Sequence, residues 1–446
     1  MSRRSLTFEG SSVQMGSAEL DSDRHGTLAS RVLLTNTNRW PSPARIAIGL
    51  AKLGCRISAI CPPRGHPVSA TSAVQEVFPY SSIRPLESLM RAISASNADL
   101  IIPCDDLGVE HLHELHERAR MLGSAGSKLS NLIEYSIGPA ESYAVVSRRW
   151  ELLRVAQEEG VRVPKFKLLS SAEDLKSWKT EHSLPWVLKR DGTFGGRGVR
   201  IVQTPEKAEQ AFEELTRLFR ATRAIKRAIV NRDPFWLRPW WQGQRPSVVV
   251  QSYVQGRPAN CTFVCWDGVV HAIASVEVLS SDGLTGPASV VRVVKSPDMT
   301  LAAERLAHRL NLSGFFGLDF IIEEGTRATF LIEMNPRCTP LSHLQLGEGR
   351  DLITALGSRL LGRRLTAPPP VTENDLIAYF PQSAELKSEF LQSSFQDIPQ
   401  GESALVEALL KPWPNSSLFY RFVSKLTGAS SEIAKHEASK SKVTPV

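Results

Sequence analysis

Two carboxylates stand in apolar stretches where strands are expected. Asp319 lies in GLDFII and Glu333 in FLIEMN, and large apolar residues flank both. A carboxylate on a buried strand is costly unless it is paired or binds a metal ion. If the strands are antiparallel neighbours, Asp319 and Glu333 lie side by side, and Asn335 points to the same face as Glu333. Two carboxylates and an amide carbonyl favour a Mg²⁺ site, in which Mn²⁺ could substitute.

Arg337 continues the same alternation beyond Asn335. Its guanidinium would reach past the metal site toward an anion. The alternative is structural, with the arginine neutralising a pair of carboxylates. We favour the ligand-binding interpretation because two buried acids, an amide and an arginine in one register are costly without a ligand.

A glycine-rich loop joins two further expected strands in WVLKRDGTFGGRGVRIV (186–202). Lys189 is the only charge in WVLK, and the glycines that follow are Gly192, Gly195, Gly196 and Gly198. Such a loop lets backbone N–H groups approach phosphate oxygens, and a lysine adds a positive charge nearby. No Gly-Lys-Ser/Thr sequence leads into a helix, so this is not a Walker A loop. The alternative is a flexible hairpin that binds nothing.

The composition is that of an ordinary globular protein, with 446 residues, 42% hydrophobic and 22% charged. This length implies two or three domains. No run approaches the roughly 18 apolar residues that span a bilayer. Residues 1–30 lack the apolar core of a signal peptide, and we expect a flexible tail there. Six scattered cysteines are typical of a reducing cytoplasm and do not suggest zinc.

Lysine and arginine exceed aspartate and glutamate by 53 to 46, a net charge of +7. This mild excess suits anionic small molecules and is a weak argument for nucleic acid. Part of it lies in the segment 217–245, whose basic residues and tryptophans could bind nucleic acid. We favour an inserted helix and loop packed by its tryptophans. His111, His113 and His116 are spaced along an expected helix, but no partner ligands are evident, so we expect a solvated helix.

From residue 31 to residue 123, apolar runs alternate with amphipathic segments. Strands are expected at 31–35, 56–61 and 99–104, and helices at 44–54, 86–97 and 107–123. This order predicts a parallel sheet with right-handed crossovers. Ligands of such sheets lie beyond the carboxyl ends of the strands, here near Thr35, Asn36 and Asp105. The loop TNTNRW (35–40) has no Gly-x-Gly-x-x-Gly pattern, so a dinucleotide site is not supported.

An α+β region follows. Its expected helices are 148–160, 170–178, 205–219 and 300–310. Its expected strands are 165–169, the two arms of 186–202, 247–254, the hairpin 259–280 with its turn at Asp267-Gly268, 314–324 and 328–336.

These motifs together resemble the ATP-grasp superfamily, and especially the branch that contains biotin carboxylase and the large subunit of carbamoyl-phosphate synthase. The resemblance runs from about 31 to about 350, and its most specific parts are LPWVLKRDGTFGGRGV and the DFI…FLIEMNPR pair. It implies an α/β and α+β protein with a Rossmann-like pre-ATP-grasp domain at 31–140 and an ATP-grasp domain at 141–365. The latter would have a small glycine-loop lobe at about 165–250 and a metal-binding lobe at about 251–350. The C-terminal extension, 366–446, has no assigned role.

The resemblance also implies roles for the site residues. Lys189 would contact the α/β-phosphates of ATP, and the loop with Gly195, Gly196 and Gly198 would close over the β/γ-phosphates. The residues of the hinge would lie along the adenine: Gln251, Ser252, Tyr253 and Val254. The metal ions would be held by Asp319, Glu333 and Asn335, with Arg337 facing the substrate carboxylate.

The sequence departs from the family pattern at two places. The family often has acidic residues where Ser252 and Pro258 stand, and both are absent here. A lysine usually opens the helix before GVRVP. Here Arg148 or Arg149 is the nearest equivalent, and Arg149 is our candidate for the nucleotide contact.

We predict a Mg-ATP-dependent ligase. A substrate carboxylate would attack the γ-phosphorus, and an amine or another nucleophile would attack the resulting acyl phosphate. Arg292 is a candidate second anion contact or an ordinary strand arginine, and His271 and Glu277 are candidate acid/base groups. Small-molecule substrates are expected, without a membrane or nucleic-acid partner, and a homodimer stays open.

Other functions remain open from the sequence. A phosphotransferase would use the same residues and stop after phosphorylating its acceptor. A non-catalytic ATP-binding or nucleic-acid-binding module would use 217–245, but the intact set of site residues argues against it. A biotin-dependent carboxylase would need a separate carrier protein, because no Met-Lys-Met segment is present.

Overall fold

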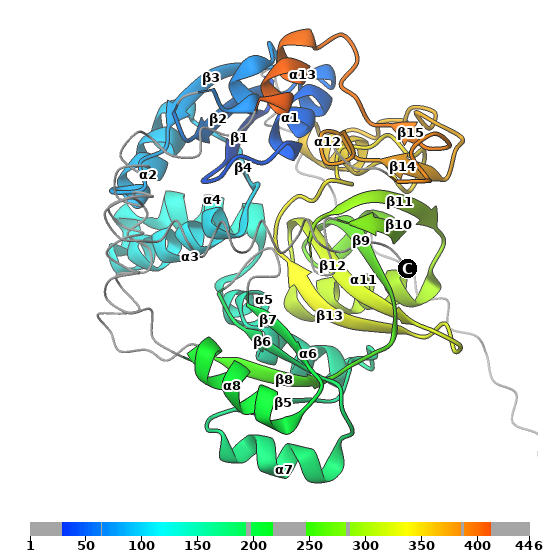
Figure 1. Cartoon of the computed structure of the whole chain (residues 1–446). Coiled ribbons are helices and arrows are strands. Elements are labelled where there is room, and N and C mark those ends of the chain that lie inside the picture. Colours follow the sequence, from blue (N-terminus) through cyan, green and yellow to red (C-terminus); the bar gives the residue numbers. More distant parts are fainter. Residues whose placement is uncertain are drawn as a thin grey trace, which may run out of the picture.

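Three sheets organise the computed structural model, which describes residues 29–63, 65–192, 198–216, 247–281, 286–384 and 388–411 (Figure 1). The expectations for the N-terminal tail before residue 29, for Gly195 and Gly196, for the segment 217–245 and for the residues after 411 lie outside these ranges.

The N-terminal region contains the predicted parallel sheet, in the order β3-β2-β1-β4. Its strands are β1 (Arg31–Thr35), β2 (Arg56–Cys61), β3 (Val74–Pro79) and β4 (Leu100–Pro103). Its main helices are α1 (Ser42–Lys52), α2 (Pro85–Ser96), α3 (Asp106–Met121) and α4 (Ser127–Ile137). Val32 and Leu34 face α1, whereas Leu33 faces α2, α3 and α4. The sequence missed β3 because this edge strand alternates half-buried and exposed residues instead of forming an apolar run.

The small lobe is an antiparallel sheet in the order β5-β8-β6-β7. Its strands are β5 (Phe166–Leu169), β6 (Trp186–Arg190), β7 (Val199–Val202) and β8 (Val248–Ser252). Helices α7 (Glu173–Glu181) and α8 (Pro205–Thr216) cover the face that carries Trp186 and Leu188. Because side chains alternate along a strand, Lys189 and Gln251 lie on the opposite face.

The third sheet has the order β13-β12-β9-β10-β11-β14-β15. Its strands are β9 (Gly256–Trp266), β10 (Val269–Ser281), β11 (Ala288–Val294), β12 (Gly314–Glu323), β13 (Thr329–Asn335), β14 (Leu376–Ala378) and β15 (Phe395–Gln396). Helices α6 (Arg149–Glu158) and α11 (Pro297–Leu310) pack on one face. Helices α12 (Leu352–Leu360) and α1 share a core with the other face.

The predicted hinge, 251–254, connects the small lobe to the third sheet. Strand β9 begins at Gly256, two residues after Val254, and a Cβ atom at Gly256 would lie 2.0 Å from the carbonyl oxygen of Ile322. Only glycine fits this close approach of two backbones, which fixes where the chain enters the third sheet.

The described part of the C-terminal extension joins the third sheet to the N-terminal region. Strands β14 and β15 extend the sheet beyond β11, and α13 (Ser403–Leu410) packs against α1 (Figure 1). Arg39 donates to the carbonyl oxygens of Ala408 and Lys411. The extension therefore holds two regions together, a role that its sequence did not predict.

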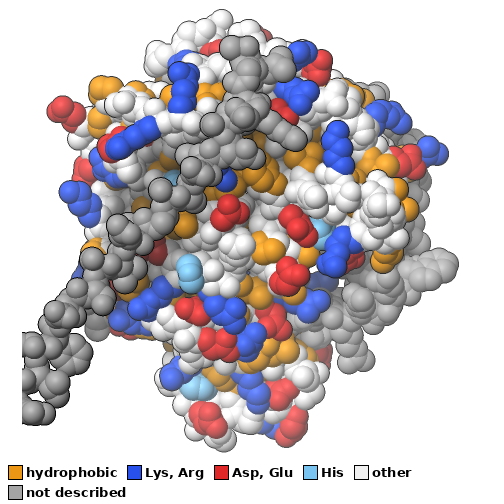
Figure 2. Space-filling model, turned by 180° about the vertical axis from the view of Figure 1, so that it is seen from behind, with side chains coloured by type: hydrophobic (Ala, Val, Ile, Leu, Met, Phe, Trp, Pro, Cys, Tyr) orange, Lys and Arg blue, Asp and Glu red, His pale blue; other side chains and the backbone are white. Residues whose placement is uncertain are grey.

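Charged side chains of both signs are interspersed over the face seen in Figure 2. Within the described ranges, no helix combines the length and the apolar character that crossing a bilayer requires. All six cysteines are buried and carry free thiols.

The expectation of a solvated helix at His111, His113 and His116 was wrong. Helix α3 packs against α4 and buries His111 and His116. The Nε2 atom of His116 lies 2.7 Å from Oε1 of Glu134, and the ring of His113 stacks on Tyr143 at 3.8 Å. These histidines have partners in the protein core.

Buried histidines should make the fold sensitive to acid. Burial lowers the pKa of His66 and His111 to about 4 and that of His113 to about 3. In the unfolded chain, histidine titrates near pH 6.5, so between about 6.5 and about 4 the unfolded chain binds more protons. Stability is therefore highest above this window and falls as the pH is lowered through it, by up to about 3 kcal/mol per group.

Urea unfolding across this pH window would measure the effect. The variant His113→Phe keeps a ring against Tyr143 but removes one titrating group, so its stability should depend less steeply on pH. The exposed His308 serves as the control, and His308→Gln should keep the wild-type slope. Equal slopes for His113→Phe and the wild type would contradict the prediction.

Candidate functional site

The two carboxylates predicted to be neighbours lie opposite each other. Asp319 of β12 pairs with Glu333 of β13, and Gly317 pairs with Asn335. The next pair is Phe320 with Leu331, so Ile332 is an extra residue at a β-bulge. A bulge redirects side chains and frees backbone groups, and here it presents the carbonyl oxygen of Ile332 to Lys189.

Asp319 is in an environment that disfavours its negative charge. Burial, followed by the negative charge of Glu333, raises its pKa to about 6. Asn335 opposes this effect by donating from Nδ2 to Asp319 Oδ2 at 3.0 Å. A divalent cation between the two carboxylates would remove the repulsion, so these residues fit Mg²⁺.

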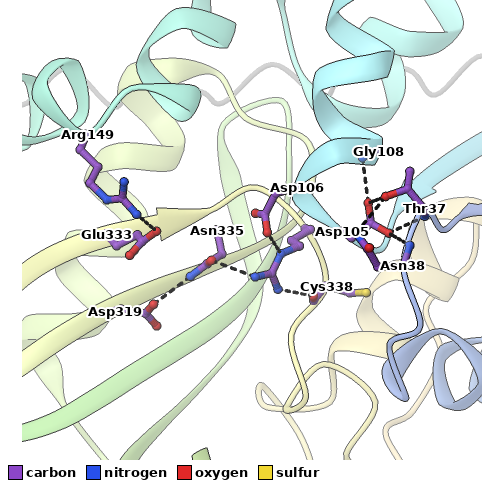
Figure 3. Close-up of polar contacts among 11 residues, drawn as sticks. Thr37, Asn38, Asp105, Asp106, Gly108, Arg149, Asp319, Glu333, Asn335 and Cys338 are labelled. Atoms are coloured by element: carbon purple, nitrogen blue, oxygen red, sulfur yellow. Dashed lines mark hydrogen bonds and ion pairs between the residues drawn. The ribbon is translucent and has the colours of Figure 1, made fainter. Parts of the chain in front are cut away.

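Asn335 connects Asp319 to Arg337. Its Oδ1 accepts a hydrogen bond from Arg337 Nη2 at 3.1 Å. Arg337 Nε lies 2.9 Å from Asp106 Oδ2, and Nη1 donates to the carbonyl oxygen of Cys338 at 3.3 Å (Figure 3). A turn of the amide about its last torsion would present Oδ1 to Asp319 instead, which is the orientation that binds a cation.

Arg149, at the start of α6, neutralises Glu333. Its Nη2 donates to Glu333 Oε1 at 2.7 Å, and its Nη1 donates to the carbonyl oxygen of Arg190 at 2.6 Å. The backbone N–H of Arg149 donates to Asp191 Oδ1 at 3.2 Å. Arg149 is buried whereas Arg148 is exposed, so the structure distinguishes the two candidates that the sequence offered.

Lys189 extends from the small lobe toward the third sheet. Its side chain is buried, and Nζ lies 3.5 Å from the carbonyl oxygen of Ile332. Burial lowers its pKa to about 8, while Glu333 and Asp319 raise it and Arg149 lowers it further. Among the described residues this is the one hydrogen bond of Nζ, and because it is long the ammonium is able to bind a phosphate oxygen.

The carboxyl edge of the N-terminal sheet meets the same group of residues. Asp105 caps α3 by accepting from Gly108 N at 2.8 Å, and it accepts from the backbone N–H groups of Thr37 and Asn38 at 2.6 and 3.1 Å. This buried carboxylate holds the loops after β1 and β4 together (Figure 3). Asn36 turns instead into the sheet, where Nδ2 donates to the carbonyl oxygen of Ile60.

The sequence did not indicate three residues that lie near the site. Asp106 forms an ion pair with Arg337, and Asp191 forms one with Arg149. The centre of the Trp40 ring lies 5.5 Å from Cζ of Arg337. Asp106 could have been noticed, since it opens a helix directly after a buried strand. Nothing in the local sequence marks Trp40 or Asp191.

Arg292 is not brought to this group. Across the sheet, Arg292 is paired with Glu277, Glu277 with Ala259, and Ala259 with Phe320, and these residues form one row. Asp319 precedes Phe320 in β12 and therefore lies in the adjacent row. Adjacent rows point to opposite faces, so Arg292 faces away from Asp319 and lies three strands from β12. It is close to Asp375, with Nε and Oδ2 3.6 Å apart.

The two candidate acid/base groups also lie elsewhere. Glu277 shares the face of Arg292 and pairs with Arg327 and Arg257. His271 is exposed beside the turn between β9 and β10. The structure therefore brings neither of them to Asp319.

The hinge residues connect the small lobe to the third sheet. The N–H groups of Ser252 and Tyr253 donate to the carbonyl oxygens of Lys165 and Pro185 at 2.9 and 3.2 Å. Gln251 is buried, and its Nε2 has no hydrogen-bond partner in the part of the chain that the structure describes. Val254 is half-buried, and Gly198 accepts from Arg190 N where β7 begins.

A metal ion here would have few protein ligands. Among the described residues, no three His, Cys, Asp or Glu side chains are grouped as a metal site. Asp319, Glu333 and Asn335 supply two carboxylates and one amide. Mg²⁺ suits such a set because it usually completes its octahedral shell with water and phosphate oxygens.

The sequence profile of the ATP-grasp domain matches residues 146–340. Among curated proteins, the formate-dependent phosphoribosylglycinamide formyltransferase of Synechococcus sp. strain CC9902 is 27% identical over 170 residues, which are 38% of this chain and 39% of the relative. The enzyme of the same name from strain RCC307 is 26% identical over 182 residues, 40% of this chain and 42% of the relative. The match thus spans about two fifths of each relative.

Solved structures share the fold over a longer stretch. An ADP complex of N5-carboxyaminoimidazole ribonucleotide synthetase has a TM-score of 0.56 at 13% identity, covering 77% of this chain and 80% of that chain. The biotin carboxylase domain of 2-oxoglutarate carboxylase from Hydrogenobacter thermophilus has a TM-score of 0.56 at 17% identity, covering 76% and 71%. An L-amino acid ligase from Bacillus licheniformis has a TM-score of 0.51 at 15% identity, covering 75% and 76%. At these identities the likeness shows the fold alone.

The contacts of Arg149 predict unequal effects for two neighbouring substitutions. Arg149→Met removes the ion pair with Glu333 and the bond to the carbonyl oxygen of Arg190, and should lower the free energy of unfolding by about 2 kcal/mol. Arg148→Met changes an exposed side chain and should stay within about 0.5 kcal/mol of the wild type. Urea unfolding measures both. Equal stabilities of the two variants would show that the buried contacts of Arg149 contribute nothing.

Proposed function

This chain belongs to the ATP-grasp superfamily, and we propose that it is a Mg-ATP-dependent ligase that activates a small-molecule carboxylate for attack by a nucleophile. One observation carries the proposal: the carboxylates of β12 and β13, Lys189 of the small lobe and Arg337 beside the N-terminal sheet converge on one region.

Lys189 would bind the phosphates of ATP from the small lobe. It is a buried ammonium whose hydrogen bond among the described residues, to the carbonyl oxygen of Ile332, is long, and it lies on the face of the sheet opposite α7 and α8. The loop with Gly195, Gly196 and Gly198 follows its strand, and we assign to this loop the closure over the β/γ-phosphates. The hinge, from Gln251 to Val254, would lie along the adenine.

Asp319, Glu333 and Asn335 would hold Mg²⁺ beside the phosphates. The metal ion, when bound, neutralises the charge of the β- and γ-phosphates and orients them. Arg149 would keep Glu333 oriented and add positive charge near the phosphates. The raised pKa of Asp319, caused by burial and by Glu333, supports a cation at this place.

Arg337 would bind the substrate carboxylate. Its guanidinium is held by Asp106 and the carbonyl oxygen of Cys338, and this defined orientation suits a planar anion. A carboxylate held there would lie near the metal-binding residues, where its oxygen can attack the γ-phosphorus. Positioning and charge neutralisation supply most of the catalysis in such a step.

The names of the similar proteins support a small carboxylate as substrate. One relative is named as formate-dependent, one solved neighbour contains a bicarbonate anion, and one is a ligase of L-amino acids. For this chain we propose the class of substrate, a carboxylate or bicarbonate, with an amine as the most suitable nucleophile.

An ADP-release screen over pairs of carboxylates and amines tests the proposal. A productive pair should release ADP only with Mg²⁺, and Glu333→Ala should lower the rate at least about a hundredfold by removing a metal ligand. The matched control is Glu348→Ala, whose exposed carboxylate lies elsewhere and whose loss should leave the rate unchanged. Full activity in Glu333→Ala would refute the metal assignment.

Hydroxylamine separates a ligase from a phosphotransferase in the same assay. It traps an acyl phosphate as a hydroxamate, so a ligase incubated with its carboxylate, Mg-ATP and hydroxylamine should form one. A phosphotransferase that makes a stable phosphate ester would release ADP without forming a hydroxamate, which would contradict the ligase.

A further inference from the structure

A small cavity lies where the N-terminal region, the loop after β13 and the C-terminal extension meet. Its volume is about 10 Å³, and its polar lining includes Ser42 and Arg45 of α1, His343 of the loop, and Gln382 and Asp397 of the extension. Such a volume accepts a single group the size of a water molecule.

The charges around this cavity cancel. Asp397 Oδ1 lies 2.6 Å from Arg45 Nη2, and its Oδ2 lies 2.9 Å from His343 Nε2. Arg45 Nη1 also donates to the backbone carbonyl oxygen of Asp397 at 2.8 Å. Burial raises the pKa of Asp397, but His343 and Arg45 outweigh it and hold the pKa below its usual value. The aspartate is thus a carboxylate whose charge is balanced by the guanidinium.

His343 presents a free acceptor under these conditions. Burial lowers its pKa, so the ring is neutral and carries one proton. The contact with Asp397 places that proton on Nε2, which leaves Nδ1 as an acceptor. Only 7% of the His343 side chain is exposed, and Nδ1 has no hydrogen-bond partner among the described residues.

Gln382 supplies a second acceptor of the same kind. Its Oε1 is buried and likewise has no partner within the described ranges. Buried polar atoms are rarely left unpaired in folded proteins. Two unpaired acceptors disfavour an anion, and a site without net charge disfavours a metal ion. They fit a group that donates hydrogen bonds.

Two of the segments that line the cavity are close in sequence to Arg337 or to Trp40, which lies beside Arg337. The loop that carries His343 begins at Arg337, and Pro41, which lines the cavity, directly follows Trp40. Trp40 in turn lies 5.5 Å from the Arg337 guanidinium. The cavity is thus lined by the same two segments of the chain that carry Arg337, to which the proposed function assigns the substrate carboxylate, and Trp40.

We propose that this cavity is the subsite for the amino group of the nitrogen nucleophile, with His343 Nδ1 and Gln382 Oε1 accepting its hydrogen bonds. The assignment to a nucleophile rests on the proposed ligase function. The site itself, a binding site for ammonia or a primary amine, does not. A larger amine would place only its amino head in so small a cavity.

Nitrogen NMR of the whole chain, labelled with ¹⁵N-histidine, tests the proposal. The signal of His343 is assigned by its loss in His343→Gln. Ammonium chloride or methylammonium chloride is then titrated in an alkaline buffer that supplies the free amine, against potassium chloride at equal ionic strength. We expect the Nδ1 signal to shift to saturation with both amines and to stay in place with potassium. Gln382→Leu should weaken this binding about tenfold through the loss of one hydrogen bond. Gln396→Leu, an exposed glutamine of the same extension, should leave it unchanged.

The outcomes separate this proposal from the proposed function. An Nδ1 signal that amines do not move, or that potassium moves equally, means that the cavity holds water only and overturns the subsite. Mg²⁺-dependent ATP binding is measured on the same samples. Retained ATP binding without amine binding refutes the subsite alone, whereas amine binding without ATP binding supports the amine site and refutes the ligase alone.

Discussion

The repulsion between two carboxylates on adjacent strands is the constraint around which the rest of the site is arranged. Asp319 and Glu333 are paired across β12 and β13, and burial together with the charge of Glu333 keeps the pKa of Asp319 high. Such a pair needs positive charge nearby. The protein supplies it from separate elements, with Arg149 from α6 and Lys189 from the small lobe. The start of α6 and the strand β6 of the small lobe therefore both lie beside the carboxylate pair.

A second feature is the contact between the end of β13 and the N-terminal region. Asn335 forms hydrogen bonds with Asp319 and Arg337, and Arg337 forms an ion pair with Asp106 at the start of α3. Asp105, the adjacent residue, ties the loops after β1 and β4 together. A substrate bound at the edge of the N-terminal sheet would thus meet residues already aligned with the carboxylates. The C-terminal extension also links the third sheet to the N-terminal region, because it continues that sheet and packs on α1.

The sequence predicted the parts of the site that follow from local alternation. The period of two along a strand placed Asp319, Glu333 and Asn335 on one face, and the apolar runs located most strands. The contacts between separate helices and strands could not be predicted from the sequence. The burial of Arg149 instead of Arg148 depends on how α6 meets β13, and the pairing of Asp106 with Arg337 depends on how two regions dock. The position of Arg292 could not be predicted for the same reason. The sheet face on which its side chain lies, relative to Asp319, depends on how β11, β10, β9 and β12 pair with one another.

The most direct test of the account is the Mg²⁺ dependence of ATP binding by the whole chain, measured by isothermal titration calorimetry. Asp319→Asn removes one carboxylate of the pair, and Asp298→Asn, at an exposed position of α11, is the matched control. The account predicts that Mg²⁺ tightens ATP binding in the wild type and in Asp298→Asn, and that Asp319→Asn loses at least about tenfold of this gain. An equal gain from Mg²⁺ in Asp319→Asn and the wild type would contradict it.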